Sequence, residues 1–177
     1  IFQDFSCLQK IFKKKINYTM SAITGINGLI PTLEVIKFSK IVSIANKESI
    51  ICAWNLIYKE LLKNNTNFIP VDSEHFSIWY ALNNKTNKNI DKIYLTASGG
   101  SLLKVPKKKY NSLKLEKILK HPNWKMGKKI TIDSSTLMNK VFEIIEAKKI
   151  FNLEYNKLEI IIPSYSTDRR HCCWSKF

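Results

Sequence analysis

Two carboxylates one residue apart, Asp72 and Glu74, follow a short apolar run at residues 68–71. Such a run is typical of a buried strand. Both carboxylates would then leave the sheet at its carboxyl end, where open α/β sheets bind ligands. Two hard oxygen donors there, joined by a third from elsewhere in the chain, suit Mg²⁺ or Mn²⁺. The alternative is that Asp72 or Ser73 only caps the helix that starts near residue 76.

A second set of polar side chains shares one face of a helix expected at residues 137–149. Asn139, Lys140 and Glu143 have i, i+3 and i, i+4 spacing, which places them side by side on a helix. Lys140 and Asn139 could bind phosphate or hydroxyl groups, and Glu143 could supply the third carboxylate. The alternative is a Lys–Glu pair on the protein surface, which contributes little.

Two loops complete the candidate chemistry. Residues 98–100, Ser-Gly-Gly, can expose backbone N–H groups to an anion, although the same triplet also forms ordinary turns. Residues 121–127 contain Trp124 and Met126 among polar residues, which suits a lid that closes over a charged substrate. The alternative is a surface loop that Trp124 anchors in the core.

Strands and helices must alternate to bring these residues together. We predict strands at residues 41–45, 68–71, 93–97, 129–132 and 158–162, and helices from residue 31, at 48–63, near 112–120 and at 137–149. Residues 1–20 indicate only a basic entry segment, with helix as one option. The alternation predicts an α/β fold. The first four strands each end in a polar cluster, so parallel neighbours would direct these clusters into one crevice.

Composition narrows the function classes. The chain has 177 residues, enough for one domain or two small ones, and 45% hydrophobic residues exclude a disordered chain. No apolar run approaches the roughly 20 residues of a membrane span, and the four cysteines lack metal-ligand spacing, so we expect a reducing compartment. The net charge is +15, but only Arg169 and Arg170 are arginine, whereas base readout favours arginine. We therefore expect no nucleic-acid partner, and keep a Lys-rich, non-catalytic nucleic-acid- or phosphate-binding protein as the alternative.

Five motifs occur in order along the chain. They are Ala-Asn-Lys-Glu-Ser at 45–49, Pro-Val-Asp-Ser-Glu-His at 70–75, Ser-Gly-Gly at 98–100, His-Pro-Asn-Trp-Lys-Met-Gly-Lys-Lys-Ile at 121–130, and Asp-Ser-Ser-Thr-Leu-Met-Asn-Lys at 133–140. Their order and spacing resemble the 1-deoxy-D-xylulose 5-phosphate reductoisomerase family over residues 21–162. Another metal-dependent enzyme acting on a sugar phosphate is the enzymatic alternative.

The resemblance implies an enzyme that needs NADPH and Mg²⁺ or Mn²⁺. It would rearrange and reduce 1-deoxy-D-xylulose 5-phosphate to 2-C-methyl-D-erythritol 4-phosphate in non-mevalonate isoprenoid biosynthesis. The implied metal ligands are Asp72, Glu74 and Glu143, and the implied catalytic residues are these three with Lys47 and His121. Substrate contacts would come from Ser73, Ser98, His121, Ser134, Asn139 and Lys140. NADPH contacts would come from Asn46, Lys47, Glu48, Gly25, Gly28 and Met126.

The same resemblance divides the chain into three parts. Residues 1–71 would be the rear part of a Rossmann-like NADPH-binding domain, residues 72–162 an α/β catalytic domain, and residues 163–177 a tail outside the family pattern. We expect the fold to be incomplete at both ends and the chain alone to lack turnover. The family implies a homodimer in the bacterial cytoplasm, or in a plastid-type organelle if the source is eukaryotic. Two departures from the family pattern are Ser101-Leu102, where Pro-Phe is usual, and Val141, where Gly is usual.

Overall fold

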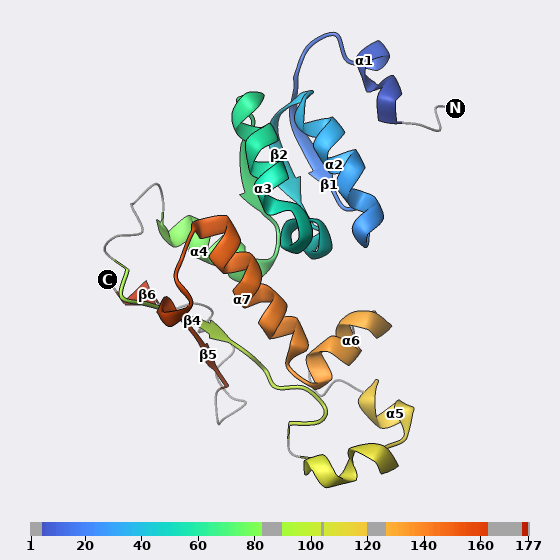
Figure 1. Cartoon of the computed structure of the whole chain (residues 1–177), viewed down its shortest axis with the longest axis vertical. Coiled ribbons are helices and arrows are strands. Elements are labelled where there is room, and N and C mark those ends of the chain that lie inside the picture. The colour runs from blue at the N-terminus through green and yellow to red at the C-terminus, as the bar shows by residue number, and fades with distance from the viewer. Residues whose placement is uncertain (1–4, 83–89, 104, 120–126, 163–174, 177) are drawn as a thin grey trace. The chain divides into compact units, whose positions relative to one another are not determined.

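The computed structural model describes residues 5–82, 90–103, 105–119, 127–162 and 175–176 (Figure 1). The chain divides into two compact units. Unit 1 comprises Ile1–Thr86 with Lys149–Asn152, and unit 2 comprises Asn87–Lys148 with Leu153–Phe177. Both units combine helices with a sheet that contains parallel strands, so the predicted α/β class is confirmed.

Unit 1 is built on a parallel three-stranded sheet in the order β1-β2-β3. Parallel neighbours need a crossover on one side of the sheet, and two helices provide these connections (Figure 1). The strands are β1 (Ile16–Ser21), β2 (Ser39–Ile44) and β3 (Asn67–Pro70). The helices are η1 (Phe5–Cys7), α1 (Leu8–Ile11), η2 (Ile26–Gly28), α2 (Leu29–Ile36), α3 (Lys47–Lys63) and α4 (Ser73–Leu82).

The core of unit 1 lies between the central strand β2 and the helices α2 and α3. Its buried members are Ile36, Val42, Ile44, Ile50, Trp54, Ile57 and Leu61. The four from α3 recur at i, i+4, i+7 and i+11, which gives this helix one apolar face. The fully buried run in β2 is typical of an inner parallel strand. The predictions at 41–45, 68–71 and 48–63 are therefore confirmed to within two residues.

Strand β1 was not predicted, although its residues Ile16–Ser21 alternate between apolar and polar side chains, because residues 1–20 indicated only a basic entry segment. Besides its backbone pairing with β2, the strand makes hydroxyl contacts with its neighbours. Ser21 Oγ lies 2.6 Å from Thr32 Oγ1 of α2, and Thr19 Oγ1 lies 2.7 Å from Ser39 Oγ of β2. Thr32 also donates to the carbonyl of Gly28 at 2.6 Å. The alternation predicts the opposite buried face, because the apolar Tyr18 and Met20 are exposed while Ser21 is buried.

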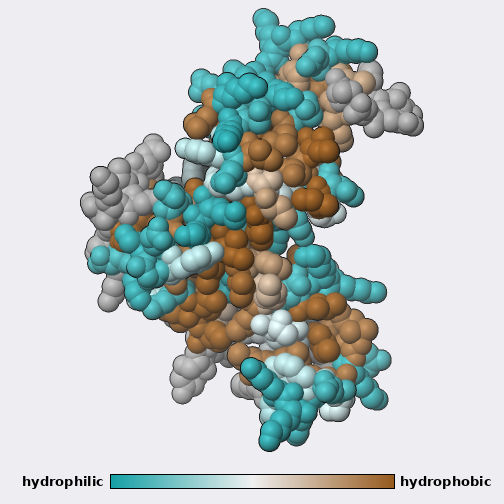
Figure 2. Space-filling view, viewed as in Figure 1, coloured by the Kyte–Doolittle hydropathy of each residue, from teal (hydrophilic) through white to brown (hydrophobic). Residues whose placement is uncertain are grey.

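Helix α2 carries apolar side chains on its outer side as well. Figure 2 shows hydrophobic side chains at the surface in the region that Figure 1 labels α2. Ile30 of α2 and Ile26 of the preceding η2 are exposed. The predicted start at Pro31 is two residues late, since the helix begins at Leu29 and Pro31 lies in its first turn. Proline is tolerated there because first-turn N–H groups have no partner within the helix.

Unit 2 contains a second sheet in the order β5-β4-β6, parallel between β4 and β5 and antiparallel between β4 and β6. The strands are β4 (Lys92–Thr96), β5 (Leu158–Ile161) and β6 (Ser175–Lys176). The helices are η4 (Lys107–Ser112), α5 (Leu115–Ile118), α6 (Lys128–Ser135), α7 (Met138–Phe151) and η5 (Tyr155–Lys157). Predictions at 93–97, 137–149 and 158–162 are confirmed, whereas the helix near 112–120 is only a single turn.

The strand predicted at residues 129–132 is wrong, because these residues form helix α6. The Ile-Thr-Ile sequence favours a strand by propensity, but local hydrogen bonds favour the helix. The N–H and the hydroxyl of Thr131 both donate to the Gly127 carbonyl at 3.0 Å, and Lys129 pairs with Asp133 at 3.0 Å one turn later. The polar cluster at Asp133 thus lies at the end of a helix and not of a strand. Of the four strand ends that were expected to lie together, only those of β2 and β3 are neighbours in one sheet, and β4 belongs to the other sheet.

Among the described residues, no helix combines the length and apolar character that a transmembrane span requires. Residues 121–126 of the predicted lid, which include His121, Trp124 and Met126, lie outside the described residues, as do residues 163–174 and 177 of the predicted tail.

Candidate functional site

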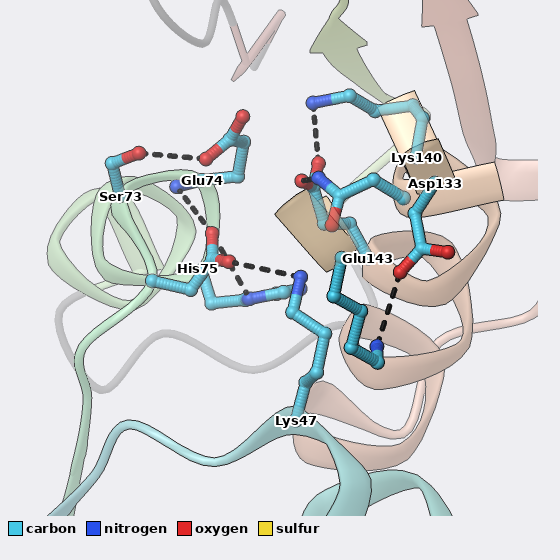
Figure 3. A network of polar contacts seen from close by, with 10 residues as sticks. Lys47, Ser73, Glu74, His75, Asp133, Lys140 and Glu143 are labelled. Carbon is cyan, nitrogen blue, oxygen red and sulfur yellow. Dashed lines mark hydrogen bonds and ion pairs between the residues drawn. The ribbon is translucent and has the colours of Figure 1, made fainter. Parts of the chain in front are cut away.

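Asp72 stands between β3 and α4 and caps the helix. Its Oδ1 accepts a hydrogen bond from the Glu74 N–H at 3.2 Å, and its carbonyl accepts from the Phe76 N–H at 2.8 Å. In the first turn, Ser73 Oγ donates to Glu74 Oε2 at 2.7 Å (Figure 3). Capping, the alternative to a metal role for Asp72, is therefore confirmed. It does not exclude a metal role, because the cap occupies only one carboxylate oxygen.

The Asp72 carboxylate is surrounded by charge within unit 1. Lys47 Nζ of α3 lies 3.9 Å from Oδ2, and Nδ1 of the buried His75 lies 3.5 Å from Oδ1 (Figure 3). Burial raises the pKa of Asp72 above its usual value, and the neighbouring Glu74 raises it further, while His75 and Lys47 oppose this shift. The folded chain thus disfavours negative charge here, and a bound cation would relieve that cost.

Asn46 organises the glycine-bearing turn that follows β1. Its buried side chain caps α3 by accepting from the Ser49 N–H at 2.8 Å, and its Nδ2 donates to the carbonyls of Ile23 and Gly25. Gly25 has φ 72°, a conformation that glycine adopts without strain. A Cβ on Gly28 would collide with the Asn46 amide. Both predicted glycines are therefore needed for the shape of this turn, whatever it binds.

Helix α7 carries a buried polar group in unit 2. Lys140 and Glu143 are both buried and form an ion pair, and Asn139 Nδ2 donates to Glu143 Oε1 at 2.5 Å (Figure 3). The three residues share one helix face, as their spacing predicts. The alternative of a surface pair is wrong. Ionic groups that are buried need such partners, and a buried pair by itself is weak evidence of a stabilising role.

The turn at residues 98–100 lies against the end of α6, also within unit 2. Gly99 has φ 74°, and a Cβ on Gly100 would overlap the carbonyl of Ser134 and the backbone of Ser135. Glycine thus lets two backbone segments approach closely at this point. Ser98 is exposed beside it. The structure therefore brings together the Ser-Gly-Gly turn and the Asp-Ser-Ser motif, which are more than 30 residues apart in the sequence.

The sequence places His75 in the motif at residues 70–75 but predicts no role or partner for it. The structure gives it Asp72 as a partner. The available signal was the i, i+3 spacing of Asp72 and His75 at a helix start. Glu48 lies half-buried in the first turn of α3, beside Lys47.

Comparison with known proteins agrees with these motifs. Residues 68–151 match a family described as the 1-deoxy-D-xylulose 5-phosphate reductoisomerase C-terminal domain, and residues 2–54 match 1-deoxy-D-xylulose 5-phosphate reductoisomerase. The chain belongs to this reductoisomerase family. The predicted boundary between residues 71 and 72 lies a few residues inside the match at residues 68–151. It remains a prediction, as does the tail at 163–177.

Relatives and solved structures of the reductoisomerase family cover most of the chain. The reductoisomerase of Pelagibacter ubique (strain HTCC1062) is 61% identical over 164 residues, which is 92% of this chain and 42% of the relative. One from Bacillus thuringiensis subsp. konkukian (strain 97-27) is 44% identical over 85% of this chain and 39% of its own length. The chain thus spans about two-fifths of the relatives it matches.

Two solved reductoisomerases have a similar fold. The Zymomonas mobilis enzyme in complex with NADPH is 34% identical, with a TM-score of 0.77 over 89% of this chain and 40% of the other. A reductoisomerase in complex with NADPH, fosmidomycin and magnesium is 36% identical, with a TM-score of 0.74 over 85% of this chain and 39% of the other.

Proposed function

We propose that this chain carries the metal- and phosphate-binding part of an enzyme that converts 1-deoxy-D-xylulose 5-phosphate to 2-C-methyl-D-erythritol 4-phosphate in non-mevalonate isoprenoid biosynthesis. The observation that supports it most is the buried ion pair of Lys140 and Glu143 on α7, with Asn139 hydrogen-bonded to Glu143. Packing alone would favour apolar side chains there, because burying charge is costly. Buried ionic clusters of this kind are enriched at functional sites.

The proposed metal ligands are Asp72, Glu74 and Glu143. Carboxylate oxygens are the donors that Mg²⁺ and Mn²⁺ prefer, and the raised pKa of Asp72 fits a position that a cation completes. When bound, the ion would supply Lewis-acid chemistry toward the carbonyl and hydroxyl oxygens of the sugar. A similar reductoisomerase has been solved in complex with fosmidomycin and magnesium, which supports this assignment.

The proposed phosphate contacts come from Ser98, Ser134, Asn139 and Lys140. The close approach of Gly100 to Ser134 supports a shared role for these two segments. Lys140 would contribute positive charge, and the serines would contribute hydroxyl donors. Such contacts lie away from the reacting carbons and supply binding energy for orientation. Ser73 would contact the rest of the sugar, and His121, outside the described residues, would join the substrate contacts.

The proposed NADPH contacts are Gly25, Gly28, Asn46, Lys47, Glu48 and Met126. Because the Asn46 side chain is committed to the turn, we propose that it acts by shaping the backbone at Gly25. Lys47 would lie near both the cofactor and the substrate, and its pair with Asp72 supports a place beside the metal ligands. NADPH itself would supply the hydride.

Calorimetric titration of the chain with fosmidomycin and Mg²⁺ tests the proposal. We expect saturable binding that needs Mg²⁺ and is lost in Lys140→Gln. The matched control is Lys37→Gln, because Lys37 also forms an i, i+3 pair with a glutamate, at the surface of α2. That control should bind as the parent does. Equal binding by both variants, with far-UV circular dichroism unchanged, would overturn the phosphate role of Lys140.

Homodimerisation and a bacterial cytoplasmic location belong to the same proposal. Their support is the family membership and the bacterial relatives. Analytical ultracentrifugation tests the dimer, and a monomer at tens of micromolar concentration contradicts it for this chain. If the chain were instead a Lys-rich nucleic-acid-binding protein, it would bind a DNA duplex in a salt-sensitive manner with no response to Mg²⁺. The same preparation can check this.

A further inference from the structure

Leu137 has an unusual backbone conformation at the junction of α6 and α7. Its φ is 63°, in the left-handed region. The other non-glycine residues with positive φ in the described part of the chain are Asn65 and Asn152, and asparagine is a residue type that tolerates this region. Leucine does not gain the local side-chain hydrogen bond that favours asparagine there. A leucine therefore holds this conformation only because its surroundings enforce it.

Hydrogen bonds on both sides of Leu137 tie the two helices together. The Leu137 N–H donates to the Ser134 carbonyl at 3.1 Å, at the end of α6. The Leu137 carbonyl accepts from the N–H groups of Lys140 and Val141 at 3.0 and 3.2 Å, in the first turn of α7. One residue thus closes the last turn of one helix and opens the first turn of the next. A change in its φ and ψ angles would move Ser134 relative to Lys140.

The same helix ends carry the proposed phosphate contacts. The carbonyl of Ser134 fits against Gly100, where no Cβ can be accommodated. Two residues beyond Leu137, Asn139 donates a hydrogen bond to Glu143, which pairs with the buried Lys140. All of these residues belong to unit 2. The left-handed turn therefore sits between the two halves of one candidate anion site.

We propose that Leu137 is a positioning residue, whose left-handed backbone holds the Ser134 end of α6 and the start of α7 in register to form one wall for the substrate phosphate. This inference rests on the proposed function for the identity of the anion. It goes further by naming the backbone conformation, not the leucine side chain, as the feature on which affinity depends.

A crossed pair of variants in the full 177-residue chain separates backbone from side chain. Leu137→Asn removes the apolar side chain but keeps a residue that adopts the left-handed region. Leu137→Val keeps an apolar side chain, but its β-branch strongly disfavours that region. The probes are inorganic phosphate, and fosmidomycin with Mg²⁺, each titrated by calorimetry.

We expect Leu137→Asn to bind both probes within about twofold of the parent. We expect Leu137→Val to bind about tenfold or more weakly, because apparent affinity falls with the population of the competent backbone. Unfolding measured by circular dichroism reports stability separately. If Leu137→Val fails to fold, Leu137→Ile takes its place, because isoleucine keeps the volume of leucine and carries the same β-branch, and the same loss is expected.

The opposite pattern overturns the inference: a folded asparagine variant that loses affinity while the valine variant binds normally would make the side chain decisive. Parental affinity in both variants also overturns it. Failure of the proposed function looks different, because the parent itself would then bind neither probe. In that case the NMR chemical shift of the Gly100 amide still tests the role of the Leu137 backbone. This resonance should shift in Leu137→Val and stay in place in Leu137→Asn.

Discussion

Replacing Asp72 by asparagine or by alanine separates its two roles, as helix cap and as proposed metal ligand. Asparagine keeps an oxygen that accepts from the Glu74 N–H, whereas alanine removes it. Loss of a cap costs about 1 kcal/mol. We therefore expect Asp72→Ala to be less stable than Asp72→Asn by about that amount, whether or not metal is present.

The helix cap of Asp72 stabilises the folded chain, whereas the negative charge of its carboxylate destabilises it at neutral pH. Its pKa is raised in the folded chain, chiefly by burial, so the folded state holds the proton more tightly than the unfolded state. The contribution of Asp72 to stability is therefore greatest below the unfolded pKa, about 4, and falls as pH rises through the raised folded pKa. At pH 7 without metal, Asp72→Asn should be at least as stable as the parent.

Bound metal should make the parent more stable than Asp72→Asn, which reverses the order expected at pH 7 without metal. At a Mn²⁺ concentration 100 times the dissociation constant, binding adds about 2.7 kcal/mol of stability. For a chain of this size each kcal/mol shifts Tm by about 2–4 °C, which predicts an upward shift of about 5–10 °C for the parent. Neither variant should shift.

Differential scanning fluorimetry at pH 5 and 7, with and without Mn²⁺, measures all of these effects. The reasoning is refuted if Asp72→Asn gains as much from Mn²⁺ as the parent. It is also refuted if, without metal, Asp72→Asn loses as much stability as Asp72→Ala, because the cap would then depend on the carboxylate itself.

Three other substitutions test the surrounding structure. Asn46→Ala should lower the free energy of unfolding, measured by urea denaturation, by about 2–4 kcal/mol. About 1 kcal/mol of this comes from the lost helix cap, and the rest comes from backbone carbonyls left without a donor. Asn46→Asp should restore only the contribution of the cap. Gly100→Ala should lower the free energy of unfolding by about 1–3 kcal/mol through overpacking against Ser134, and it should weaken phosphate binding measured by calorimetry. Unchanged phosphate binding would show that the contact between Gly100 and Ser134 does not shape the phosphate site. Thr66→Val should cost about 1–2 kcal/mol, because the Thr66 hydroxyl bonds the carbonyls of Ile36 and Ser39; Thr66→Ser should restore most of it.

Strands and helices with a clear apolar pattern could be predicted from the sequence. The strand at 68–71 and the helix at 48–63 have apolar residues at the spacing their burial requires. The β1 strand has the alternating pattern of a strand, but this pattern predicts the wrong buried face: Ser21 is buried against Thr32, whereas Tyr18 and Met20 are exposed. In α6, the β-branched Ile-Thr-Ile run favoured a strand, but hydrogen bonds to Gly127 decided for a helix.

The sequence predicted which residues make up the candidate site, but not how buried they are or which partners they have. Spacing placed Asn139, Lys140 and Glu143 on one helix face, but it could not distinguish a buried group from a surface pair, because burial depends on what packs over the helix. The sequence also left open whether Asp72 caps a helix, binds metal or does both, since one carboxylate can cap with one oxygen and offer the other. The left-handed turn at Leu137 left no trace in the sequence, because leucine is an ordinary helix former.

The hydroxyl contacts between β1 and α2 have a consequence for how unit 1 finds its alignment. Methyl groups can slide past one another at little cost, but a hydroxyl buried without its partner loses the whole bond. Ser21, Thr32 and the Gly28 carbonyl form one chain of such bonds, so shifting the strand by one residue would break it and turn every side chain to the other face. Alignment at this edge of the sheet is thus specified by hydroxyl groups, because the apolar side chains of Tyr18 and Met20 are exposed and specify it only weakly.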